Sequence, residues 1–228
     1  MGSGQGGAGV IAPLLAAVVL SGPTVVNLEV KADGRPFGKM EYSHFGGKDG
    51  GRTVRWKIRQ IDENGVLTIS DEQTWDRAGR PRSFTRTMTG TEGTTIVSGK
   101  FGDKGVDVSF SHAGLKETES YTAPARRSLI NPTVFWFTEL KPKPGAQTQV
   151  SEFDFDDMQW VTKTITYAGP EKMVVGGKAV TAHRLDYGAA EKMWVDDAGY
   201  PLRTTEEDAG TVLTMERIWP VPVVKKKK

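Results

Sequence analysis

The sequence contains no cysteine among its 228 residues. It therefore has no disulfide, no thiolate metal site and no cysteine nucleophile, and it lacks the cysteine that would carry a lipid anchor. A chain of this length does not need disulfides to be stable, because it is mainly small secreted domains that depend on them. The absence of cysteine is compatible with an oxidising or a reducing compartment.

Signatures of catalytic and cofactor sites are missing as well. The three histidines, His44, His112 and His183, are far apart and show none of the spacings typical of a zinc site. No G-x-S-x-G segment presents a serine nucleophile, and no glycine-rich phosphate-binding or dinucleotide-binding pattern occurs. We therefore expect no enzyme activity, no metal and no cofactor.

Neither sign of charge is in large excess. The chain has 30 basic and 28 acidic residues, which gives a net charge of +2. No strong field would attract nucleic acid, so we expect no nucleic-acid partner. Residues 221–228 form a basic tail that ends in the run Lys225 to Lys228. We interpret this tail as solvated, and a contact with an anionic lipid or polymer is the alternative.

The N-terminal apolar segment is too short for a transmembrane helix, which needs about 20 apolar residues. This segment, Gly9 to Gly22, has the length of the apolar core of a signal peptide but lacks a lysine or arginine ahead of it. It is either a signal sequence, which would make the protein periplasmic or secreted, or a buried N-terminal helix or strand. We treat residues 1–23 as a signal-like or flexible segment.

Alternation of polar and apolar residues dominates the rest of the chain. Val54, Trp56 and Ile58 fall on one face of a predicted strand, and Arg55 and Lys57 fall on the other. Strands with one packed and one wet face are typical of antiparallel sheets. The 27 glycines and 12 prolines fit many short strands joined by tight turns.

These patterns predict one all-β domain over residues 24–220, built on a large, twisted antiparallel sheet. One short helix is expected over 132–140, with Asn131 as its cap and Pro132 at its first position. The predicted strands are 25–31, 36–44, 52–61, 65–75, 82–89, 94–101, 106–111, 115–122, 147–155, 160–167, 171–175, 179–187, 191–196, 202–207 and 211–219.

One turn sequence occurs twice. Asp76 to Pro81 and Asp196 to Pro201 both read D-x-A-G-x-P, with Trp75 and Trp194 just ahead. The simpler interpretation is one favoured hairpin turn used twice. The alternative is that the chain consists of two related β halves, which have diverged by insertion because a second shared hairpin lies at a different offset.

Three segments together resemble the periplasmic lipoprotein-localisation carriers (LolA/LolB-like) and their uncharacterised relatives. They are the opening hairpin Val30 to Gly38, the central Leu140 to Gly145, and the late pair Tyr167 to Glu171 and Trp194 to Arg203. The resemblance implies a sheet curled into an open half-barrel, with a helix or loop over a concave face that holds acyl chains in the carriers. No ligand-binding residue of the carriers can be matched to a position in this chain.

Two charged stretches have alternative interpretations. The segment Glu152 to Asp157 places three carboxylates on one strand face and Phe153 and Phe155 on the other; it is either a solvated strand edge or a calcium or acid–base site. The basic ladder Arg55, Lys57 and Arg59 either pairs with acidic residues of the next strand or lines a groove for an anionic ligand.

Large aromatic residues are the candidate ligand-binding residues. They are Phe135, Trp136 and Phe137 on the predicted helix, and Trp160 and Trp56 on predicted strands. Core packing is the alternative role for them. The sequence thus predicts a non-enzymatic extracytoplasmic binding module that accepts a lipid, an acyl chain or another amphiphile on its concave face. The alternative is a structural or protein-interaction domain of the cell envelope, which would bind an envelope protein and no small molecule.

Overall fold

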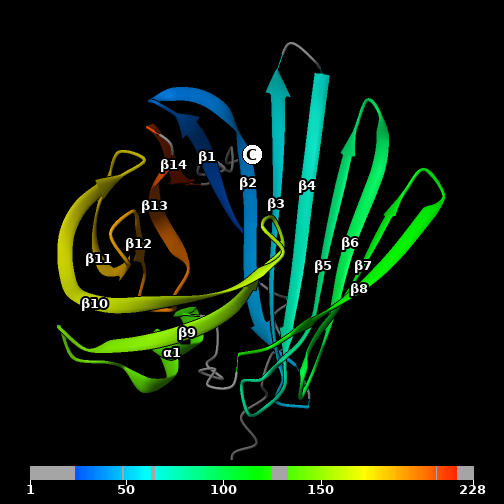
Figure 1. Ribbon diagram of the computed structural model, residues 1–228. Coiled ribbons are helices and arrows are strands. Elements are labelled where there is room, and N and C mark those ends of the chain that lie inside the picture. Colours follow the sequence, from blue (N-terminus) through cyan, green and yellow to red (C-terminus); the bar gives the residue numbers. More distant parts are fainter. Residues whose placement is uncertain (1–23, 48, 63–64, 125–132, 209, 220–228) are drawn as a thin grey trace, which may run out of the picture.

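The computed structural model describes residues 24–47, 49–62, 65–124, 133–208 and 210–219. This part of the chain forms fourteen strands and one helix, α1 (Thr133–Leu140), and all of the strands belong to one antiparallel sheet (Figure 1). The strands are β1 (Val26–Ala32), β2 (Arg35–Gly46), β3 (Arg52–Asp62), β4 (Gly65–Trp75), β5 (Pro81–Gly90), β6 (Gly93–Gly102), β7 (Gly105–His112), β8 (Leu115–Thr122), β9 (Gln147–Asp154), β10 (Gln159–Val175), β11 (Lys178–Tyr187), β12 (Glu191–Val195), β13 (Pro201–Asp208) and β14 (Thr211–Ile218).

The strand order shows how the two halves of the chain are joined. β2 to β8 follow one another on one side of β1, and β14 back to β9 follow one another on the other side. Leu28 at the centre of β1 lies opposite Met40 of β2 and Arg217 of β14. In the described part of the chain the sheet does not close, and β8 and β9 are its edges. The prediction of an all-β open half-barrel with one short helix is confirmed.

The strand boundaries agree with the predicted ranges to within two residues, except at β10. There the prediction of separate strands at 160–167 and 171–175 is wrong, because β10 continues from Gln159 to Val175. A bulge between Tyr167 and Gly169 takes up the extra residue, and Gly169 has a φ of 121°, which is favourable for glycine alone. Beyond the bulge, Pro170 pairs with His183 and the strand resumes.

The repeated turn sequence forms the same structure at both places. In each turn the aspartate N–H donates to the carbonyl of the residue before proline, from Asp76 to Arg80 and from Asp196 to Tyr200. The aspartate side chains accept from the backbone N–H of those same residues, at 2.9 Å in both turns. The D-x-A-G-x-P pattern is therefore a local hairpin signal, which ends β4 and β12 and begins β5 and β13.

The hairpin of β9 and β10 reaches from one half of the sheet to the other. Figure 1 shows these two strands curving from the half that contains β11 to β13 toward β2 to β5. Near the tip of the hairpin, the ring of Phe155 stacks on Phe84 of β5, with ring centroids 3.7 Å apart. Phe153 is buried in the same cluster with Val97 and Val106. Side chains therefore bring the two halves together without closing the hydrogen-bond ladder.

Helix α1 fills the inner side of the half formed by β9 to β12. Its Trp136 and Phe137 are buried with Val150, Ile165 and Leu185. The predicted helix is present, whereas its predicted cap, Asn131 and Pro132, lies outside the described residues. With eight residues, α1 is too short to cross a membrane, and the described residues contain no other helix.

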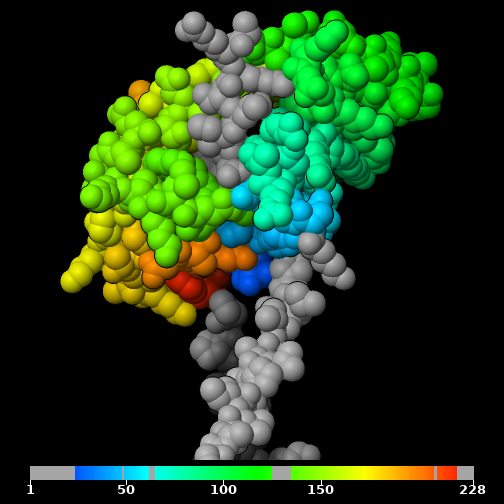
Figure 2. All heavy atoms as spheres, turned by 90° about the horizontal axis from the view of Figure 1, so that it is seen from below, coloured from blue at the N-terminus to red at the C-terminus, as the bar shows by residue number. Residues whose placement is uncertain are grey.

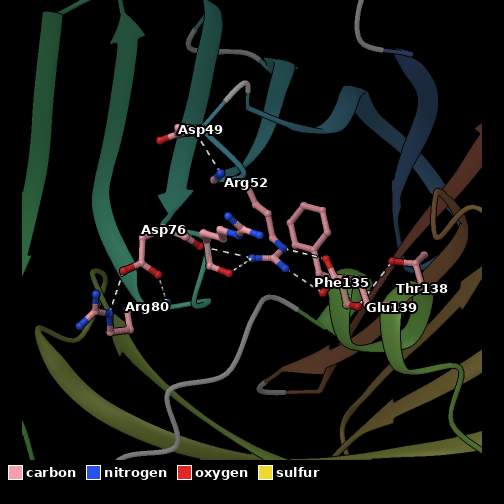
Figure 3. Close-up of polar contacts among 9 residues, drawn as sticks. Asp49, Arg52, Asp76, Arg80, Phe135, Thr138 and Glu139 are labelled. Atoms are coloured by element: carbon pink, nitrogen blue, oxygen red, sulfur yellow. Dashed lines mark hydrogen bonds and ion pairs between the residues drawn. The ribbon is translucent and has the colours of Figure 1, made fainter. Parts of the chain in front are cut away.

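One arginine connects α1 to the opposite half of the sheet. Arg52 of β3 donates from Nε and from Nη2 to the two carboxylate oxygens of Glu139, at 2.8 Å each, and its guanidinium lies 5.6 Å from the ring centre of Phe135 (Figure 3). Its Nη1 also donates to the carbonyls of Asp76 and Arg77 in the β4–β5 turn. Figure 2 shows this junction from below, with α1 and β9 beside the β4–β5 end of the sheet.

Candidate ligand-binding site

A cavity of about 370 Å³ lies between the two halves of the sheet. Residues of β2 to β6 line it on one side, and residues of β9 to β12 line it on the other. Strand register explains the first wall: Tyr42 lies opposite Trp56, and Gln73 lies opposite Phe84. Directly opposed residues of antiparallel strands point to the same side of the sheet, so these side chains share the concave face.

Aromatic rings make up much of the cavity wall. Phe101 and Trp160 meet edge to face with ring centroids 6.1 Å apart, and Phe153 and Trp160 do so at 5.5 Å. Phe155 stacks on Phe84 beside them. The wall is therefore mainly apolar, which is typical of pockets that take small apolar ligands.

The first polar group of the cavity is centred on Arg86 of β5. Its Nε and Nη2 donate to the two carboxylate oxygens of Asp71, at 3.0 and 2.9 Å, and its Nη1 donates to Asp156 at the hairpin tip. The guanidinium also lies over the rings of Trp56 and Phe84. Only 2% of the Asp71 side chain is exposed, and this burial raises the pKa of Asp71 although Arg86 acts against the rise.

The second polar group joins β9, β10 and β12. Lys163 forms an ion pair with Glu152 at 2.8 Å. Desolvation acts to lower the pKa of Lys163, but the hydrogen bond and the charge of Glu152 outweigh it, and the pKa is raised. Burial raises the pKa of Glu191 to about 7; the charges of Glu206 and Glu152 add to the rise, and Lys163 opposes it. A carboxyl group that titrates near neutral pH in a cavity is a frequent mark of a functional site.

The predicted aromatic site residues fall into two groups. Trp56 and Trp160 both line the cavity, so the structure brings together these two strand residues from opposite halves of the chain. Phe135, Trp136 and Phe137 do not line it; each has 6–7% of its surface exposed. Trp136 and Phe137 pack in the core beneath α1, and Phe135 packs against His44 and Arg52.

Several lining residues were missed from the sequence, among them Arg86, Lys163 and Glu191. Arg86 carried a usable signal, because it alternates in phase with Phe84 and Met88 and so falls on the apolar face of its strand. A charged residue on the inner face of a strand is unusual unless it is paired or functional. Glu191 begins a strand of five residues, which is too short for its alternation to show which face is buried.

The three carboxylates predicted to share one face of the acidic segment each have a partner within the protein. Glu152 pairs with Lys163, Asp156 pairs with Arg86, and Asp154 accepts backbone hydrogen bonds from Asp156 and Asp157. Across the described residues, no three or more histidine, aspartate or glutamate side chains are grouped so as to hold a metal ion. The segment therefore serves to shape the hairpin tip and to place charge in the cavity.

The basic ladder lies on the outer face of the sheet, and its Arg55 pairs across to the next strand. Arg55 of β3 forms an ion pair with Glu72 of β4, which lies directly opposite it. This arrangement confirms the cross-strand interpretation for Arg55. Because the inward-facing Trp56 separates Arg55 from Lys57 on the strand, the ladder lies on the convex side, away from the cavity.

The three histidines each contact side chains of neighbouring strands or turns, and none of them lines the cavity. His183 bonds to the Tyr167 hydroxyl at 2.7 Å and to Asp197 at 2.8 Å. His112 bonds to Thr95 at 2.7 Å. His44 stacks on Tyr200, with ring centroids 4.1 Å apart.

Comparisons with known proteins extend the description of the fold. No protein-family model matches the sequence, and no curated protein matches it. Among solved structures, the chain is similar to a β-barrel-like protein of the domain of unknown function DUF1849 from Brucella abortus. That match has 14% identity and a TM-score of 0.56, and it covers 86% of this chain and 95% of the other. The chain also matches a DUF1089 family protein from Pseudomonas aeruginosa with 13% identity and a TM-score of 0.39, over 72% of this chain and 87% of the other.

The DUF1849 match supports a barrel-like β fold for most of the chain. An open β sheet of this kind is consistent with the fold implied by the resemblance to the lipoprotein-localisation carriers. Neither matched structure is a lipoprotein-localisation carrier by its description, so the likeness concerns architecture alone.

Proposed function

We propose that the protein is a non-enzymatic binding module that holds an apolar or amphiphilic ligand, such as a lipid or an acyl chain, on the concave face of its sheet. The observation that carries the proposal is the cavity of about 370 Å³ between the β9–β10 hairpin and strands β2 to β6. Its volume is within the range of ligand pockets, about 300–1,000 Å³. Its aromatic wall suits an apolar chain, and its two charged groups suit a polar end.

The polar lining favours binding over catalysis. Arg86 and Lys163 are both in ion pairs with carboxylates of the protein. The hydroxyls of Thr74 and Ser83 bond to each other at 2.7 Å, and no histidine is found among the described lining residues to activate either one. A nucleophile paired with a base is the usual requirement for covalent catalysis.

The site of action that we propose is the periplasm or the extracellular space. The support is the apolar segment Gly9 to Gly22, whose length suits a signal peptide; it lies outside the described residues. Sequencing the N-terminus of the exported protein tests this. A start near Thr24 is expected, and a protein retaining Met1 in the cytoplasm would contradict the proposal.

Native mass spectrometry of the purified protein, combined with displacement of an environment-sensitive dye, tests the binding function. We expect a co-purified or added amphiphile to be retained and to displace the dye. Gln73→Trp places an indole in the cavity and should reduce binding, whereas Ile61→Trp adds the same group at a site that is 61% exposed and should not. Absence of any bound amphiphile together with no displacement would reject the proposal.

A structural or protein-interaction role is the second candidate, and the far end of β7 and β8 favours it. β8 pairs with β7 alone in the described sheet, and Phe110 and Leu115 nearby are 40% and 72% exposed. Exposed edges and apolar side chains are common at protein interfaces. A pull-down with Leu115→Ser as the control variant tests this role: a partner lost from that variant supports it, and recovery of no partner from an envelope extract counts against it.

A further inference from the structure

The charged residues that line the cavity are mostly acidic. Four carboxylates and two cations line it: Glu152, Asp154, Asp156 and Glu191 against Arg86 and Lys163. Asp71 adds a further carboxylate beneath Arg86, and Glu206 lies directly opposite Glu191 on β13. In a cavity with low-dielectric walls, such an excess attracts positive charge and repels negative charge.

Both cations of the cavity are already in ion pairs with carboxylates of the protein. Arg86 is held by both oxygens of Asp71 and by Asp156, and two aromatic rings flank its guanidinium. Lys163 is held by Glu152. An anionic ligand at Arg86 would have to break the pair with Asp71, whose side chain is only 2% exposed, and leave that buried carboxylate without its partner, which is strongly unfavourable.

Glu191 is the carboxylate that lacks a direct partner. No side chain of the described residues forms an ion pair or a hydrogen bond with it. The charge of Lys163 attracts it from a distance, and the charges of Glu206 and Glu152 repel it. Tyr187 lies directly opposite Glu191 on β11, and Trp160 lines the same cavity. A carboxylate beside aromatic rings is the arrangement that receives ammonium groups, because the faces of the rings also attract cations.

From this charge distribution we propose that the ligand is an amphiphile with a cationic headgroup, an amine or a quaternary ammonium, which sits beside Glu191 while its apolar chain follows the aromatic wall. This inference rests on the proposed function, since it identifies the ligand class of the same cavity.

Binding of such a cation should release a proton near neutral pH. The pKa of the Glu191 carboxyl is about 7. A cation beside it favours the ionised form, so affinity should rise as the pH increases through 7 and should level off above it. The charged groups that act on the Glu191 carboxyl are Lys163 on β10, Glu206 on β13 and Glu152 on β9, and Tyr187 lies opposite Glu191 on β11.

Three probes with twelve-carbon chains test the inference by calorimetry below their critical micelle concentrations. They are dodecyltrimethylammonium, dodecanoate and the uncharged dodecyl maltoside. We expect the cationic probe to bind at least about tenfold more tightly than dodecanoate, and added salt to weaken this preference. Equal or tighter binding of dodecanoate would overturn the headgroup assignment and leave the proposed function standing. Binding of none of the three would reject both.

Two matched variants test the role of Glu191. Glu191→Gln should remove most of the preference for the cation and its dependence on pH, while binding of dodecyl maltoside stays the same. Glu207→Gln removes a carboxylate from the exposed face of β13, one residue from Glu206, and should change neither. A full cation preference retained in Glu191→Gln would overturn the assignment.

A loss of cation preference in Glu191→Gln would not come from misfolding, because this variant should be at least as stable as the original protein at and above neutral pH. The pKa of Glu191 is higher in the folded protein than its ordinary value of 4.5, so its favourable contribution to stability is complete below about 4.5 and is lost as the pH rises through about 7. Replacing a buried charge by a neutral amide removes that loss.

Discussion

The close packing of Phe155 requires glycine at position 99, because no side chain fits there. A Cβ at Gly99 would lie 2.8 Å from two carbons of the Phe155 ring and 3.2 Å from a methyl of Val106. A glycine inside a strand is often the mark of such a close approach. The contact matters because Phe155 carries the tip of the hairpin that closes one side of the cavity.

Gly99→Ala should therefore destabilise the protein by about 1–3 kcal/mol, because overpacking forces the Phe155 ring away from Phe84. Urea unfolding followed by tryptophan fluorescence measures the change. Gly102→Ala is the control on the same strand, since a Cβ there meets no atom within 4 Å, and it should stay within about 0.5 kcal/mol of the original protein. Equal effects of the two substitutions would contradict this account of the tip.

His44 should make the protein less stable in acid. Burial lowers the pKa of His44, although the backbone of Ala198 and the charge of Asp196 oppose the shift. Its contribution to stability is thus complete above the ordinary pKa of about 6.5 and is lost as the pH falls toward the lowered value, because the unfolded chain takes up the proton first.

The pH dependence of chemical unfolding, compared between the original protein and His44→Gln, isolates this effect. Glu191 and Asp71 titrate in both proteins and drop out of the difference. We expect the advantage of the original protein over the variant to shrink as the pH falls below about 6.5. A difference that does not depend on pH would show that His44 is protonated equally in the folded and unfolded chain.

The candidate site was partly predictable from single residues. Trp56 and Trp160 could be found because large aromatics on alternating strands tend to face inward. Phe135 to Phe137 attracted the same prediction, but a helix of eight residues against a sheet buries all three aromatics in packing. Arg86 and Glu191 acquire their surroundings from the opposite half of the chain, and local sequence carries no information about that contact.

At the scale of elements, α1 is attached to the far half of the sheet by the two-pronged ion pair of Arg52 and Glu139 (Figure 3). Two parallel hydrogen bonds fix the orientation of a guanidinium more firmly than one, and lysine cannot reproduce them. The Arg52 side chain is 15% exposed and the Glu139 side chain 41%, so water reaches this pair from the glutamate side and competes with it less than with a fully exposed pair.

A double-mutant cycle with Arg52→Ala and Glu139→Ala should give a coupling energy of about 1 kcal/mol, measured from unfolding in denaturant. The ion pair of Arg82 and Asp49 is the control, because both of its side chains are more than half exposed. Its coupling should stay below about 0.5 kcal/mol. If the Arg52 pair coupled no more strongly than this control, α1 would be held by its apolar contacts alone.

Most elements could be predicted because each strand and turn carries its own signal. The alternation marked the strands, and the D-x-A-G-x-P turns marked where β4 and β12 end. The continuity of β10 was not predictable, since a bulge at Gly169 depends on pairing with β11 across the sheet. The local sequence indicates a break in the strand there, whereas hydrogen bonds with β11 keep β10 continuous on both sides of the bulge.

For the whole molecule, the pairing of β1 with β14 and the crossing of the β9–β10 hairpin decide the shape. No local sequence pattern predicts either of these contacts, because both join segments that are distant in sequence. The same arrangement leaves the sheet open, with β8 as an edge strand that pairs only with β7 in the described part of the chain. Such an edge can pair with a second molecule unless charged side chains prevent it.

β8 has this protection in Lys116, Glu117 and Glu119, which are all exposed. Replacing the three by valine should leave each molecule folded but produce dimers or larger aggregates at high concentration, because the bare edge then favours strand addition. Sedimentation velocity across a concentration series measures this. The matched control replaces Lys39 and Glu41 on β2 and Glu207 on β13 by valine, which removes one cation and two carboxylates as on β8. These are interior strands whose backbones are paired on both sides, so this variant should self-associate less. If both variants associated equally, the association would result from the lost charges alone, and the β8 edge would have no special role.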